Sequence, residues 1–163
     1  MSSPVVYDKA KYHHETVMDY GLDSAQTEVH TAFFLGWLLD NDLTSEDFNH
    51  ESRDLVARYR SREIDAIKVY EWWDCCLVDD MLNDTGNAFA QYYFDFEHGQ
   101  YLADYHELLV GDLPSEFHVH YSWENYQVIR KRIDERFEEW KALGHPKRQI
   151  KERLAKRPWW KLW

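Results

Sequence analysis

The segment from Asp79 to Tyr105 combines carboxylates with aromatic rings and contains no lysine or arginine. Tyrosine and phenylalanine supply large contact areas at a small cost in side-chain entropy, and carboxylates select a positively charged partner. This composition predicts recognition of a cationic surface rather than bond making or breaking. The residues that we expect to form the binding surface are Trp72, Asp79, Asp80, Asp84, Tyr92, Asp95 and Glu97.

Structural roles compete with this interpretation. The three aspartates at 79, 80 and 84 could end one helix and cap the next, with Gly86 supplying a backbone angle that other residues resist. Consecutive rings, as in Trp72-Trp73 and 92–94, span too wide an arc of a helix to face one core. Some of them must therefore lie near the surface, either as half-buried rings with their polar tips in water or as binding hot spots.

Histidines offer a second kind of chemistry. His118 and His120, together with His98, Glu97 or Asp95, supply imidazole and carboxylate groups that suit zinc or iron. The sequence contains no His-Glu-x-x-His motif and no matched Glu-x-x-His pair that would place such ligands on one helix face. Solvated histidines are therefore the favoured interpretation, and no metal or other cofactor is expected. A small enzyme with a carboxylate–histidine site at 95, 97, 98 and 118 stays as an alternative.

Nucleophilic catalysis has less support. Neither a glycine-rich phosphate loop nor a nucleophile elbow occurs in the sequence. Cys75 and Cys76 lie among acidic residues such as Asp74 and Asp79, which raise the pKa of a thiol. A disulfide between adjacent cysteines would be strained. We expect both cysteines to be packing residues in a reducing compartment, and the protein not to be an enzyme.

The charge is divided unevenly along the 163 residues. Residues 1–144 hold 12 Lys and Arg against 29 Asp and Glu, whereas residues 145–163 hold 7 against 1. An acidic body repels phosphates, so a nucleic-acid partner is disfavoured and a cationic protein is the more natural target. The start of the chain lacks the pattern of a signal peptide, and no apolar run approaches the length of a membrane span. These features predict a cytoplasmic protein.

The elements that must position these residues are predicted to be helices. Asp23-Ser24 caps a helix that runs to Asp40, Thr44-Ser45 opens a short helix, and a second helical stretch contains Tyr59. Helical spacing continues from Ile64 to Leu82, and another helix begins near 85 or 87. Residues 117–121 alternate but have no partner, so an ordered connection is expected there. The clearest helix is capped by Ser122 and stops at Gly144.

The chain is thus predicted to be all-α: a single multi-helix domain at 1–144 with an appendage at 145–163. The appendage is basic and amphipathic and ends in tryptophans at 159, 160 and 163. Such a segment could lie on an anionic membrane surface. The opposite charges favour packing on the acidic domain, which also covers apolar rings that would otherwise face water.

Four stretches, Tyr7–His13, Val29–Leu38, Asp80–Phe94 and Trp123–Tyr126, resemble a family of small bacterial cytoplasmic proteins of unknown function. Members of this kind are similar to the immunity proteins of polymorphic, contact-dependent and type VI secretion toxin systems. The resemblance implies a protein that binds and neutralises a cognate antibacterial toxin, and it supplies no catalytic residues. A non-catalytic adaptor or scaffold module is the remaining alternative.

Overall fold

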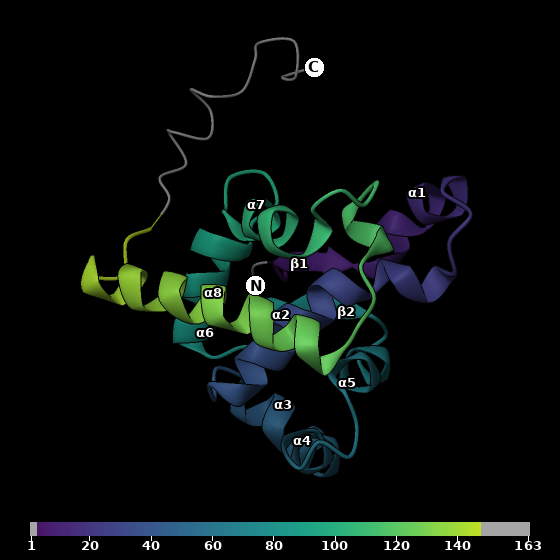
Figure 1. The fold of residues 1–163 in the computed structure, drawn as a ribbon. Coiled ribbons are helices and arrows are strands. Elements are labelled where there is room, and N and C mark those ends of the chain that lie inside the picture. The colour runs from purple at the N-terminus through teal and green to yellow at the C-terminus, as the bar shows by residue number, and fades with distance from the viewer. Residues whose placement is uncertain (1–2, 148–163) are drawn as a thin grey trace.

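A buried helix, α2 (Val29–Asp40), runs through the centre of the protein, for which a computed structural model describes residues 3–147 (Figure 1). Every residue from 29 to 39 is buried. Apart from His30 and Thr31, its buried residues are apolar on every side, as expected of a helix that other elements cover around its whole circumference. A 3₁₀ turn, Ser24–Thr27, precedes it, and the carboxylate of Asp23 accepts a hydrogen bond from Ala25 N at 2.8 Å. Asp23 therefore caps this turn, and the prediction that it caps the helix ending at Asp40 is wrong, because α2 begins at Val29 after Glu28, whose side chain makes no cap hydrogen bond.

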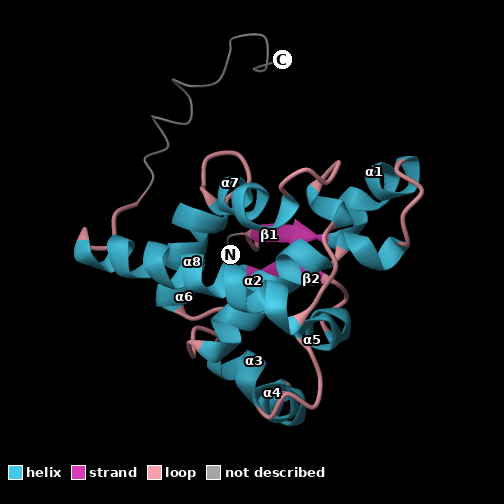
Figure 2. Cartoon of the chain, in the orientation of Figure 1, coloured by secondary structure: helices cyan, strands magenta, loops and turns pink. Residues whose placement is uncertain are grey.

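Helices dominate the rest of the described chain (Figure 2). They are α1 (His14–Asp19), α3 (Glu46–Glu51), α4 (Arg53–Arg60), α5 (Ala66–Trp72), α6 (Asp84–Phe89), α7 (Tyr101–Tyr105) and α8 (Trp123–Ala142). The π-helical turns Ala90–Phe94 and His106–Val110 continue α6 and α7, and 3₁₀ turns occupy Ala10–His13, Asp79–Met81 and Glu116–His118. The prediction of a compact helical domain is confirmed.

A small sheet interrupts the helical pattern. Strand β1 (Val6–Lys9) pairs antiparallel with β2 (Cys76–Val78). The predicted helix over 64–82 is therefore wrong beyond the end of α5. Asp74 and Cys75 adopt positive φ angles of 55° and 53°, which no α-helix permits, and turn the chain into β2. The strand depends on a partner about 70 residues earlier in the chain, and local periodicity carries no information about such a partner.

The long helix α8 agrees with its prediction. The hydroxyl of Ser122 accepts a hydrogen bond from Asn125 N at 3.0 Å, and Gly144, with φ 84°, follows the end of the helix. Tyr126, Ile129 and Trp140 belong to its buried face. Residues 148–163 lie outside the described residues, so the packing of the predicted basic appendage stays a prediction.

A buried carboxylate joins α7 to α8. The Asp104 side chain is 4% exposed and accepts hydrogen bonds from Arg132 at 2.9 Å, Arg136 at 2.8 and 2.9 Å, and the hydroxyl of Tyr93 at 2.8 Å. Burial alone would raise the pKa of this carboxyl, but the three donors outweigh burial and lower it. Asp104 is therefore held as a charged group between α7 and α8.

Candidate functional site

An open groove of about 820 Å³ lies between the start of the chain and the segment that follows α6. Residues 5–7 form one side, and the other comes from α6, its π-helical turn and the loop that follows. The lining residues are Val5, Val6, Tyr7, Asp84, Asn87, Ala88, Gln91, Tyr92, Asp95, Phe96, Glu97 and Lys147. The groove thus combines three carboxylates with three aromatic rings and one described cation.

Its acidic groups are held in different ways. Asp84 and Glu97 are exposed, whereas the carboxylate of Asp95 is 18% exposed and accepts a hydrogen bond from Glu97 N at 2.9 Å. Asp84 occupies the first turn of α6, and the cap is Asn83, whose side chain accepts from Gly86 N at 2.8 Å. The predicted cap at Asp84 is therefore wrong by one residue, which leaves this carboxylate facing the groove.

The aromatic side of the groove is anchored by Tyr7. Its hydroxyl donates to the amide oxygen of Asn87 at 2.6 Å, and burial raises the pKa of this phenol to about 12. The phenol is thus neutral at physiological pH and fixed in orientation. Tyr7, Asn87 and Phe96 were missed by the sequence analysis, because nothing local shows that the chain start meets residues 80 to 90 positions later.

Four of the seven predicted binding residues line the groove: Asp84, Tyr92, Asp95 and Glu97. The other three lie outside it. Trp72 is 64% exposed at the end of α5, whereas Asp79 and Asp80 belong to the 3₁₀ turn before α6. The rings at 92–94 divide as expected, with Tyr93 and Phe94 buried in the core and Tyr92 half-buried at the groove.

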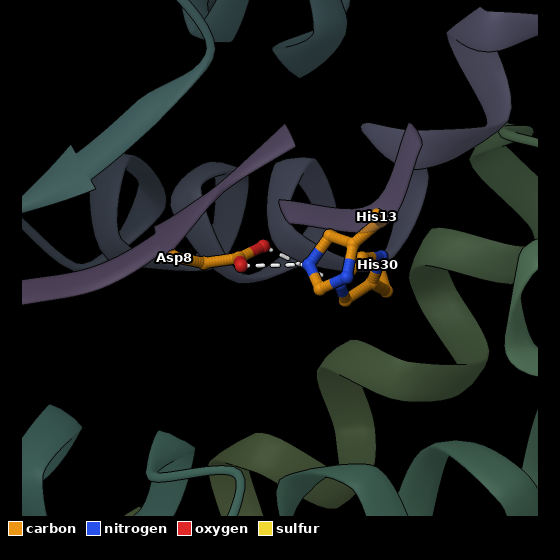
Figure 3. Close-up of side chains that lie close together, drawn as sticks. All are labelled: Asp8, His13 and His30. Carbon is orange, nitrogen blue, oxygen red and sulfur yellow. Dashed lines mark hydrogen bonds and ion pairs between the residues drawn. The ribbon is translucent and has the colours of Figure 1, made fainter. Parts of the chain in front are cut away.

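A second polar group lies inside the protein, where β1, the 3₁₀ turn after it and α2 meet (Figure 3). The carboxylate of Asp8 is 2% exposed; its Oδ1 lies 2.7 Å from His13 Nε2 and its Oδ2 lies 3.4 Å from His30 Nε2. The hydroxyl of Thr31 donates to Oδ2 at 2.6 Å. Burial alone would raise the pKa of Asp8, but the hydrogen bonds from both imidazoles outweigh it and hold the pKa well below its ordinary value.

Aromatic rings enclose the two imidazoles. The ring of Phe96 lies 5.6 Å from that of His30, and the ring of Phe117 lies 5.3 Å from that of His13 and 5.5 Å from that of His30. Phe96 also lines the groove. This residue therefore connects the groove with the buried carboxylate–histidine group.

Within residues 3–147, one set of three or more His, Cys, Asp or Glu side chains has all its ligand atoms within 4.8 Å of one another. This set is Asp8, His13 and His30. The alternative set at residues 95, 97, 98 and 118 is not assembled in this way: the imidazole of His118 bonds the hydroxyl of Ser115 at 2.8 Å. The sequence signal that we missed was His30, a lone imidazole in an otherwise apolar helix.

The thiol of Cys75 donates to Glu28 Oε1 at 3.0 Å. Burial and this glutamate raise the pKa of the thiol to about 12, as the acidic surroundings predicted. Cys75 and Cys76 are both free thiols. A protonated thiol is a poor nucleophile, so a packing role stays the prediction for Cys75.

The fold and these two features define a helical domain with an acidic, aromatic groove beside a buried carboxylate–histidine group. The chain belongs to the family described as a domain of unknown function, DUF7832, whose sequence model matches residues 6–119. That range contains every groove residue except Val5 and Lys147, and all three members of the buried group. No curated protein and no solved structure matches the chain. No helix within residues 3–147 is long and apolar enough to cross a membrane.

Proposed function

We propose that this protein is a bacterial immunity protein that neutralises a cognate antibacterial toxin in the cytoplasm by binding a cationic part of it in the acidic groove. The observation that carries the proposal is the convergence of Asp84, Asp95 and Glu97 with the rings of Tyr7, Tyr92 and Phe96 on one concave surface. The mode of action is binding, and the groove supplies specificity through charge and aromatic contact.

The composition of the groove suits this role. Exposed carboxylates attract a basic protein from a distance and accelerate association, whereas half-buried rings supply the contact area that slows dissociation. Toxins that act on nucleic acids or nucleotides need basic clefts for their own substrates. An acidic groove opposite such a cleft would block it by occupying the positions that phosphates take.

By its composition, the basic end of this chain would compete with a toxin for the groove. Lys147 lines it, and six further Lys and Arg follow between 148 and 163. A segment of this composition would bind the same carboxylates as a toxin would. The test must therefore separate binding of a partner from binding of the chain's own end.

The test is co-expression of the full chain with the product of the gene immediately upstream, followed by growth assays and co-purification. We expect growth to be rescued and a near-stoichiometric complex to form. The groove variant is Asp84→Lys/Glu97→Lys, whose residues are exposed. It should weaken the complex by a factor of about 10 or more, mostly through slower association at low salt. Asp95 is left unchanged because its carboxylate holds the local turn.

The matched control is Asp47→Lys/Glu51→Lys, which makes the same change of charge on α3. Asp47, like Asp84, lies in the first turn of its helix, so the effects on helix stability are comparable. Loss of rescue in the groove variant alone would support the proposal. No rescue by the wild-type protein, or equal rescue by both variants, would refute it. A wild-type complex strengthened by removal of residues 148–163 would identify the chain's own end as a competitor.

A further inference from the structure

We propose that Asp8, His13 and His30 form a binding site for a divalent transition-metal ion of the zinc class. One carboxylate and two imidazoles are the ligand set that proteins use for Zn²⁺ and for Fe²⁺. Their ligand atoms lie within 4.8 Å of one another, and the group is the one such set in the described part of the chain. The proposal is independent of the groove and of any toxin.

The spacing of the ligand atoms suits one ion. Two atoms that each lie about 2.0–2.2 Å from zinc are roughly 3.3–3.6 Å apart at a tetrahedral angle. The separation of Asp8 Oδ2 and His30 Nε2 is 3.4 Å, which already matches. Asp8 Oδ1 and His13 Nε2 are 2.7 Å apart, held by a hydrogen bond whose proton a metal would replace. To reach the tetrahedral range, this separation must lengthen by roughly 0.6–0.9 Å through a movement of His13.

His30 supplies a second, independent observation. Its side chain is 2% exposed, and Nε2 makes the 3.4 Å contact with Asp8. Its Nδ1 finds no hydrogen-bond partner among the described residues. An unsatisfied buried polar atom typically costs about 1–3 kcal/mol of stability. In this site the ligand atom would be Nε2, and its bond to the ion would stabilise the buried ring, although Nδ1 itself gains no partner from the ion.

The surroundings hold the ligands as a metal site requires. Thr31 donates to the carboxylate and fixes its orientation, in the way that outer-shell groups orient metal ligands. Phe96 and Phe117 restrict the freedom of the imidazole rings. The side chain of His13 is 18% exposed and gives the site an edge through which an ion and a water can enter. Because the three ligands come from β1, a 3₁₀ turn and α2, a bound ion would cross-link these elements.

The test uses the full chain, with any purification tag removed and the protein treated with a chelator. Zn²⁺ is titrated by calorimetry, and Co²⁺ by absorption, because four-coordinate cobalt absorbs strongly in the visible range. We expect one ion per chain, a concentration-dependent rise in melting temperature, and ¹⁵N shifts of two imidazole side chains in the zinc-loaded protein. No saturable 1:1 binding, or zinc binding that shifts no histidine, would overturn the proposal.

Adjacent histidines provide a matched pair of variants. His14 is exposed and is not a member of the group. Loss of outer-shell groups weakens metal binding by about 10–100-fold, so His13→Ala should weaken it by roughly 100-fold or more, whereas His14→Ala should leave it unchanged. Equal affinities in the two variants would contradict the assignment. The imidazole shifts of the wild-type protein decide the matter if His13→Ala fails to fold.

Discussion

Replacement of Asp104 by asparagine tests whether the buried ion network between α7 and α8 stabilises the fold. Removing one partner from a buried ion pair typically costs ~3–5 kcal/mol, because the remaining charge is left uncompensated. Here the arginines keep other acceptors: Arg132 contacts Glu107 at 2.7 Å, and Arg136 contacts Glu139 at 3.4 Å. The side chains of Arg132 and Arg136 are also 21% and 26% exposed. We therefore expect Asp104→Asn to lower the free energy of unfolding by about 2–3 kcal/mol.

The assay is urea unfolding followed by circular dichroism, with melting temperature as a second measure. A loss of this size corresponds to a fall in Tm of roughly 5–10 °C for a chain of this length. The control is Glu107→Gln, which removes an exposed acceptor of the same arginine and should cost less than about 1 kcal/mol. A loss in Asp104→Asn no larger than in this control would refute the reasoning.

The same network makes a prediction about pH. The folded-state pKa of Asp104 lies below the ordinary value of 3.8. Its contribution to stability is therefore fully present above that value and is lost as the pH falls through the lowered folded-state pKa. The stability difference between wild type and Asp104→Asn should be constant from pH 7 to about pH 5 and shrink below pH 4. A difference that grows on acidification would show that the charged form is not the stabilising one.

Two further predictions concern single positions. Gly86→Ala should cost about 1–3 kcal/mol of stability, because a Cβ there would lie 2.4 Å from the carbonyl oxygen of Leu43. The φ angle of Gly86 is not positive, so glycine is required by this close approach and not by its backbone angle. A Tm equal to that of the wild type would contradict this explanation. The reactivity of Cys75 can be measured with iodoacetamide at pH 8 in a Cys76→Ser variant. The thiol should react far more slowly in the native protein than in urea, because its raised pKa keeps it protonated. Equal rates would show that Glu28 does not protect the thiol.

The parts of the fold that the sequence predicts well are those set by local chemistry. Ser122 and Ser45 cap their helices as expected, because a cap depends on residues three positions away. The strand β2 could not be predicted, since its hydrogen bonds go to β1 at the start of the chain. The two sites were also predictable only where their residues come from one continuous segment. The acidic side of the groove comes from one continuous segment and was largely predicted, whereas the group of Asp8, His13 and His30 requires two segments to meet.

The two proposed sites share structural elements, and this decides which variants can separate them. In β1, Tyr7 lines the groove, and Asp8, the next residue, joins the buried group. Phe96 contacts both sites. Substitutions at Asp8 or Phe96 would therefore alter metal binding and partner binding together. His13 belongs to the buried group but does not line the groove, and Glu97 lines the groove but is not a ligand. Zinc affinity that depends on His13 and partner affinity that depends on Glu97 would establish the two functions separately.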